Sequence, residues 1–271
     1  MPAPEEDLAL LEEAVREAGH IARRLYGGEY KKWDKAKGMG PVTEADLAVD
    51  AFLTDRLRSA RRGYGWLSEE TEDDPARLSA ERVFIVDPID GTLAFVKGRP
   101  HFTICAGIVE GGRPIAGVVY NPVTDECFRA RTGAGAELNG APIHASARTA
   151  VEGCRLLGDK PMFQHPAWNN PPNMPWPPME IEQRSSIAYR IALVASGQWD
   201  AMMALSAKHD WDLAAADIIL TEAGGRLTTH RGDALRYNGA EAIQPSVVGA
   251  GPALHAELMK RVSHLNLPRR S

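Results

Sequence analysis

Residues 82–92 read RVFIVDPIDGT, and this stretch decides the fold prediction. The apolar run VFIV predicts a buried β-strand, and Asp87 and Asp90 follow it across a turn that Pro88 stiffens. Two carboxylates three residues apart on such a turn can converge on one point. The carbonyl of Ile89 would add a further oxygen, and Mg²⁺ prefers oxygen ligands of this kind.

The end of the same stretch is suited to bind an anion. Gly91 lets the backbone approach a ligand closely, and the N–H groups of Gly91 and Thr92 would face a phosphate if a helix begins there. Taken alone, a DPIDG segment is in most proteins only a turn. Other acids along the chain therefore decide whether this turn belongs to a site.

Three further acids lie at the ends of predicted elements. Asp46 starts a predicted helix, Glu69 follows a predicted strand, and Asp212 opens an apolar helix far downstream. Each also has an ordinary structural explanation. Asp46 closes a capping box with Thr43, Asp212 is a good N-cap, and Glu69 with Glu70 belongs to the acidic run SEETEDD.

The remaining elements follow from hydrophobic periodicity. Amphipathic helices are predicted at 8–25 and 44–57, before strands at 65–67, 82–86, 102–109, 114–120 and 126–131. Further along, helices are predicted at 187–196, 212–223 and 252–262, with a strand at 246–250. The helix at 212–223 is apolar on nearly every side and should lie between layers. Residues 31–41 are predicted to form a polar loop, and 161–178, with seven prolines, an irregular segment and not a helix.

This order predicts an α+β first half and an α/β second half. The boundary is placed after the glycine-rich turn GAGAELNGAP. An N-terminal domain at 1–146 would carry most of the acids, and a C-terminal domain at 147–271 would complete the site.

Composition narrows the class of protein. The chain has 271 residues, 44% hydrophobic and 25% charged, with a net charge of −5, which argues against a basic nucleic-acid-binding face. The first ten residues, MPAPEEDLAL, carry acids where a signal peptide would carry basic residues. No apolar run approaches the length of about 18 residues that a membrane span needs. A cytoplasmic protein without membrane contact is therefore expected. Cys105, Cys127 and Cys154 lack metal-ligand spacing and are expected to be reduced, buried thiols.

Together, these acids resemble the defining pattern of the inositol monophosphatase family of metal-dependent, lithium-sensitive phosphatases. The resemblance extends from about residue 5 to about residue 250 and includes PVTEAD, LVASG and TEAGG. In chain order, the matching positions are Asp46, Glu69-Glu70, Asp87-Pro88-Ile89-Asp90-Gly91-Thr92 and Trp211-Asp212.

The resemblance implies a layered αβαβα sandwich with two or three Mg²⁺ ions between its layers. By motif position, the metal ligands would be Glu69, Asp87, the Ile89 carbonyl, Asp90 and Asp212. Thr92 and Asp46, with Glu69 close by, would position or activate the attacking water, and the Gly91 and Thr92 amides would hold the phosphate. Paired Mg²⁺ ions both neutralise a phosphate and acidify water, so no side-chain nucleophile is required. Dimers are common in this family, so the resemblance also allows a homodimer.

The segment after Thr92 departs from the family patterns and leaves the substrate open. Leu93-Ala94-Phe95 matches neither the Thr-Asn-Phe of inositol phosphatases nor the Lys-Glu-Phe of bisphosphate nucleotidases. The acid that inositol enzymes carry about seven positions before the WD aspartate is missing from Met202-Met203-Ala204-Leu205-Ser206. Among the eight histidines, none of which shows a metal-ligand spacing, His209 lies near the predicted ligands.

Arg190 could pair with a second phosphate of a substrate, with Lys97, Arg99 and Lys208 as further cations; alternatively, it is a solvated helix residue. We therefore expect a small soluble phosphate ester, first a 3'(2'),5'-bisphosphate nucleotide such as 3'-phosphoadenosine 5'-phosphate. The alternatives are an inositol-1-monophosphatase, a histidinol-phosphate phosphatase, or a non-catalytic metal-binding regulatory protein.

Overall fold

The structure, a computed structural model, describes residues 2–34, 40–164 and 175–267. Its largest element is a seven-stranded sheet of order β3-β4-β5-β6-β7-β8-β9, in which β3 and β4 are parallel and the other neighbouring pairs antiparallel. The strands are β3 (Gly65–Ser68), β4 (Arg82–Asp90), β5 (Thr103–Glu110), β6 (Arg113–Asn121), β7 (Glu126–Arg131), β8 (Ala136–Leu138) and β9 (Ala141–Ile143). This sheet confirms the predicted antiparallel meander.

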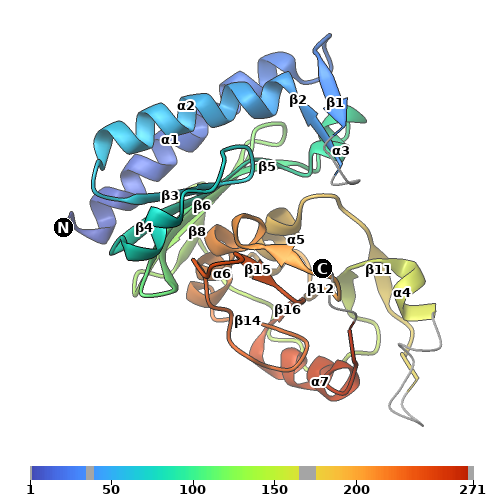
Figure 1. The fold of residues 1–271 in the computed structure, drawn as a ribbon. Coiled ribbons are helices and arrows are strands. Elements are labelled where there is room, and N and C mark those ends of the chain that lie inside the picture. The colour runs from blue at the N-terminus through green and yellow to red at the C-terminus, as the bar shows by residue number, and fades with distance from the viewer. Residues whose placement is uncertain (1, 35–39, 165–174, 268–271) are drawn as a thin grey trace.

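Helices cover both faces of this sheet (Figure 1). One face packs against α1 (Pro4–Leu25) and α2 (Glu44–Ala60) in a continuous apolar cluster. The other face packs against α5 (Ile187–Ala195) and α6 (Ala214–Glu222), which are buried along almost their whole lengths. The prediction that an apolar helix lies between layers is confirmed by α6.

A second, five-stranded sheet lies on the far side of α5 and α6 in the order β11-β10-β12-β16-β14. Its outer face packs against α7 (Pro252–Val262), which completes an αβαβα sandwich. The strands are β10 (Arg155–Leu157), β11 (Glu180–Glu182), β12 (Ala201–Ala204), β14 (Arg226–Thr228) and β16 (Val247–Ala250). The predicted layered fold class is therefore confirmed, while the boundary between 1–146 and 147–271 remains a prediction.

Three local expectations differ from the structure. In the predicted loop 31–41, β1 (Lys32–Asp34) pairs with β2 (Pro41–Thr43) as an antiparallel ladder. In the segment 161–178, expected to lack helix, α4 (Lys160–Gln164) forms one turn. This turn tolerates Pro161, because the first turn of a helix needs no backbone N–H donor at that position. Residues 165–174 lie outside the described part of the chain. The predicted helix at 212–223 begins instead as a 3₁₀ turn, η4 (Asp210–Asp212).

Candidate active site

The first two acids lie where β4 loses its regular pairing. The register of β4 against β5 shifts between Asp87 and Asp90. Pro88 cannot donate to the ladder, and such an irregularity re-aims the side chains beside it. Both carboxylates consequently lie at the end of a fully buried strand and face the same cavity.

Asp90 joins the two halves of the chain. Its carboxylate accepts hydrogen bonds from Ser186 Oγ (2.7 Å), Ala188 N (2.7 Å) and Ile187 N (3.2 Å). These donors form the N-terminus of α5, whose unpaired N–H groups favour an acid at this position. Ser186 also caps α5 by accepting from Tyr189 N, a role that its place before an apolar helix could have indicated.

Thr92 and Asp46 form a hydroxyl–carboxylate pair beside the cluster. Thr92 Oγ1 lies 3.0 Å from Asp46 Oδ1 and 3.1 Å from the Ile89 carbonyl oxygen. Asp46 Oδ2 accepts from Thr43 N at 2.8 Å, and this confirms the predicted capping box of α2. One oxygen of Asp46 therefore serves the helix while the other meets Thr92. The preceding Gly91, with φ of 93°, occupies the left-handed conformation that glycine adopts without strain.

The carboxylates of Asp87, Asp90 and Asp212 converge. Each offers an oxygen that lies within 4.8 Å of the oxygens from the other two. Asp212 comes from η4, where its Oδ2 accepts from His209 N at 2.9 Å. Among the described residues, Asp87 Oδ1 is buried without a hydrogen-bond partner. Glu69 borders the same cavity of about 350 Å³.

Burial and mutual repulsion oppose ionisation of this cluster. Loss of solvent raises the pKa of Asp87, and the nearby charges of Glu69, Asp90 and Asp212 raise it further. The pKa values of Asp90 and Asp212 are raised for the same reasons, again with burial as the largest cause. Burial also raises the pKa of Asp46, against the effect of its hydrogen bonds.

A hard divalent cation fits these residues. Burial of carboxylates without a compensating positive charge destabilises the folded state. A cation would relieve the repulsion among these carboxylates and bind Asp87 Oδ1, which has no hydrogen-bond partner among the described residues. Carboxylate and carbonyl oxygens suit Mg²⁺, Ca²⁺ or Mn²⁺ and not the softer metals. In the described residues the structure thus brings Asp87, Asp90 and Asp212 together, with Glu69, Ile89 and Thr92 around the same cavity.

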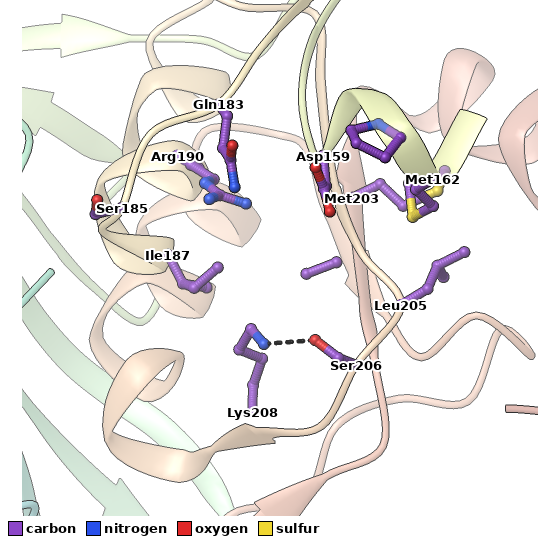
Figure 2. Close-up of a pocket in the computed structure, with 12 residues that line it drawn as sticks. Asp159, Met162, Gln183, Ser185, Ile187, Arg190, Met203, Leu205, Ser206 and Lys208 are labelled. Carbon is purple, nitrogen blue, oxygen red and sulfur yellow. Dashed lines mark hydrogen bonds between the residues drawn. The ribbon is translucent and has the colours of Figure 1, made fainter. Parts of the chain in front are cut away.

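A larger cavity of about 540 Å³ adjoins the acid cluster (Figure 2). The two cavities share Gln183, Ser185 and Arg190. Arg190 is buried, so the alternative of a solvated helix residue is wrong. Its Nε donates to the carbonyl oxygen of Arg184 at 2.6 Å, and burial lowers its pKa.

The second cation on this larger cavity is Lys208, which donates to Ser206 Oγ at 2.9 Å. Leu205 and Met203 form part of an apolar wall of the cavity. Lys97 and Arg99, proposed from the sequence as further cations, are exposed and border neither cavity. The ring of His209 stacks on Trp211 with centroids 4.3 Å apart.

The sequence also matches the model of a known family over nearly its whole length. The model of the inositol monophosphatase family matches residues 3–266. The chain belongs to this family. It is accordingly a metal-dependent phosphoric monoester hydrolase, and the family acts on small phosphate esters.

Individual relatives agree over nearly the whole chain. An inositol-1-monophosphatase from Rhizobium meliloti is 29% identical, with 96% of this chain and 97% of the relative covered. The crystal structure of the extragenic suppressor protein SuhB from Bartonella henselae superposes with a TM-score of 0.82 at 27% identity, covering 96% and 99% of the two chains. A structure of SaIMPase-II with 2'-AMP bound has a TM-score of 0.77 at 25% identity, covering 94% of this chain and 93% of that one.

In the ranges that the structure describes, no helix is long and apolar enough to cross a membrane.

Proposed function

We propose that the acid cluster binds Mg²⁺ and that this phosphatase hydrolyses a 3'(2'),5'-bisphosphate nucleotide. The observation that carries the metal assignment is the convergence of the carboxylates of Asp87, Asp90 and Asp212, of which Asp87 has a buried oxygen without a partner among the described residues. The ligands would be Glu69, Asp87, the Ile89 carbonyl, Asp90 and Asp212. Two or three ions would be held, as the family resemblance implies.

When bound, Mg²⁺ supplies positive charge to the phosphate and lowers the pKa of water. The chain's own residues prepare the reaction around it. Asp90 is anchored at α5 by three donors, so its position is set before the metal arrives. Since a carboxylate has about four lone-pair positions, Asp90 can accept these bonds and still ligate a cation.

Thr92 and Asp46 would orient the attacking water. Asp46 accepts from Thr92 Oγ1, which leaves the hydroxyl lone pairs available to accept a hydrogen bond from water. Burial keeps the pKa of Asp46 above its usual range, and this makes its carboxylate a better proton acceptor. The backbone at Gly91 and Thr92 would contact the phosphate on the cavity side.

The adjoining cavity supports the nucleotide as substrate. Arg190 and Lys208 place two cations on its wall, where they could form charge-assisted hydrogen bonds with a second phosphate. Leu205, about seven positions before Asp212, is apolar where an inositol-binding acid would be expected. A relative of the same fold was solved with 2'-AMP bound.

Inositol 1-phosphate is the second candidate, because the Rhizobium meliloti relative that matches 96% of this chain is an inositol-1-monophosphatase. A phosphate-release panel separates the candidates. It compares 3'-phosphoadenosine 5'-phosphate, inositol 1-phosphate, fructose 1,6-bisphosphate and histidinol phosphate, each with Mg²⁺ and with EDTA. Release that requires Mg²⁺ and is fastest with the nucleotide is expected, together with inhibition by Li⁺. A preference for inositol 1-phosphate would overturn the substrate assignment, and full activity in EDTA the metal assignment.

A further inference from the structure

The ligands proposed for Mg²⁺ come from segments that are far apart in the sequence. Some contact in the fold must therefore hold these segments at a fixed distance from each other. Glu69 follows β3 in the large sheet, whereas Asp212 belongs to η4 in the second half of the chain. A cation between them requires these two segments to keep a constant separation. Outside the ligands, a chain of polar contacts among the described residues, centred on the buried Arg77 and Asp210, connects them.

The first part of this connection is Arg77, in the 3₁₀ turn η2 (Pro75–Ser79), downstream of Glu69. Its side chain is 1% exposed and makes a bidentate contact with Asp73, with Nε to Oδ1 at 2.6 Å and Nη2 to Oδ2 at 2.9 Å. Its Nη1 then donates to Asn238 Oδ1 at 2.6 Å, while Asn238 Nδ2 donates back to the Arg77 carbonyl at 3.3 Å. The segment after β3 is thereby bound to a loop 161 positions further along the chain.

The second part runs from Asn238 to η4. The backbone N–H of Asn238 donates to Asp210 Oδ2 at 2.8 Å, and Gln244 Nε2 donates to Asp210 Oδ1 at 2.9 Å. Asp210 is fully buried and begins the 3₁₀ turn that ends at Asp212. Its own N–H donates to the Ala242 carbonyl at 2.9 Å, so both its backbone and its side chain are held.

We propose that Arg77, Asn238 and Asp210 form a positioning bridge that sets Glu69 and Asp212 at the separation required for Mg²⁺ binding. This proposal rests on the metal site of the proposed function. The bridge residues would not touch the metal; they would act through the two segments that carry its ligands. Partners that orient metal ligands typically change metal affinity about 10- to 100-fold when they are removed.

Two substitutions weaken the bridge at different points. Asn238→Gly removes both side-chain contacts with Arg77 but keeps the N–H that meets Asp210, and glycine readily adopts the φ of 61° found here. Arg77 Nη1 and Nη2 also donate to the Gly239 carbonyl, each at 3.1 Å, and these contacts remain in this variant. Asp210→Asn replaces an oxygen acceptor by an NH₂ donor, which opposes either the Asn238 N–H or the Gln244 amide. The glycine variant is expected to fold, because its backbone conformation is unstrained.

Asp200→Asn is the matched control. Asp200 is also a buried acid, 6% exposed, and accepts from Ser146 Oγ at 2.8 Å and Arg155 N at 2.9 Å. It precedes β12, whereas Leu205 follows the opposite end of that strand toward the larger cavity. The substitution therefore tests the general cost of disturbing a buried acid without touching the bridge.

Mg²⁺ affinity is measured by titration calorimetry and by the Mg²⁺-dependent rise in Tm, with kcat at saturating Mg²⁺ as a third readout. Asn238→Gly and Asp210→Asn should each weaken Mg²⁺ binding about tenfold, while Asp200→Asn should not. Since both substitutions act on one connection, the double variant should lose about as much as Asp210→Asn alone and not a hundredfold. If the bridge only positions the ligands, the two bridge variants should retain kcat at saturating Mg²⁺ although their Mg²⁺ affinity falls.

Unchanged Mg²⁺ affinity in both bridge variants, with only a lower Tm of the metal-free protein, would overturn the bridge and leave a purely structural role. A wild-type protein that binds no Mg²⁺ would instead contradict the proposed function itself.

Discussion

At the scale of single residues, the acid cluster combines a requirement for negative charge with a cost in stability. Asp87, Asp90 and Asp212 are crowded in a site where burial and repulsion raise each pKa. The carboxylates are held there by the end of β4, the N-terminus of α5 and the turn before α6. Function and metal-free stability should therefore respond in opposite directions when one charge is removed.

Asp212→Asn tests this opposition. Activity should fall at least about a hundredfold, or about 2.7 kcal/mol of transition-state stabilisation, because a proposed ligand is lost. The Tm in EDTA should nevertheless rise, because the wild-type carboxyl must either ionise against burial and repulsion or take up a proton on folding, and the amide does neither. The amide oxygen can still accept from His209 N. Phosphate release and thermal melting measure the two effects. A variant that is both active and destabilised would contradict the assignment.

Arg190 provides a test of substrate choice. Arg190→Ala should reduce kcat/KM for the bisphosphate nucleotide by about 1.5 to 3 kcal/mol, the value of a hydrogen bond to a charged group. Hydrolysis of inositol 1-phosphate should hardly change, since it has no second phosphate to contact Arg190. Lys97→Ala, at an exposed cation outside both cavities, is the control. Equal losses on both substrates would mean that Arg190 supports the fold through the Arg184 carbonyl.

At the scale of elements, α6 is pressed directly onto the large sheet. A Cβ atom at Gly117 of β6 would meet the carbonyl oxygen of Ala215 at 2.5 Å and its Cα at 2.8 Å. Both atoms belong to the backbone of α6, so the contact cannot be relieved by a side-chain rotation. The close approach brings the segment after Asp212 down onto the sheet that carries Asp87 and Asp90.

Gly117→Ala should therefore destabilise the protein by about 1 to 3 kcal/mol through overpacking. Activity should fall as well, because α6 begins just after η4 and would be displaced from the sheet. Denaturant unfolding and phosphate release measure these losses. Gly63→Ala is the control, since a Cβ there would meet nothing within 4 Å. Similar stabilities for the two variants would show that α6 can move away without cost.

At the scale of the whole molecule, a buried acid on α6 makes stability depend on pH. Asp217 accepts from Tyr237 Oη at 2.8 Å and Thr221 Oγ1 at 3.2 Å, and burial raises its pKa to about 6. Because this pKa lies above the unfolded value of about 3.9, the folded state retains a proton that the unfolded state loses as pH rises. The contribution of Asp217 to the free energy of unfolding should thus decrease between about pH 4 and pH 6.

Asp217→Asn removes this dependence, because the amide does not titrate. Its oxygen can accept from one of the two hydroxyl groups, while the other hydroxyl can rotate to accept from its NH₂. Relative to wild type, the variant should gain up to about 3 kcal/mol in the free energy of unfolding from pH 4 to pH 7. Chemical unfolding over this range is the measurement, and Asp55→Asn on an exposed face is the control. Parallel pH curves for the variant and wild type would refute the assignment.

The sequence predicted much of the architecture because strong periodic patterns dominate the first half. Helices at 8–25 and 44–57 and the strands from 82 to 131 correspond to α1, α2 and β4 to β7. In the second sheet, the predicted strand at 246–250 corresponds to β16, whereas β10, β11, β12 and β14 were missed. Segments such as β10 and β12, with three and four residues, carry too little periodicity to be distinguished from buried loops.

The sequence by itself determined the family, the order of the acids along the chain and the turn that carries Asp87 and Asp90, because all three are local or motif-based properties. Only the tertiary structure decided that these acids meet Asp212, that α5 donates to Asp90, and that Arg190 is buried on a cavity beside them. Each of these facts depends on contacts between residues about a hundred or more positions apart. Such distances in space are set by the packing of two sheets around α5 and α6, which no local pattern encodes.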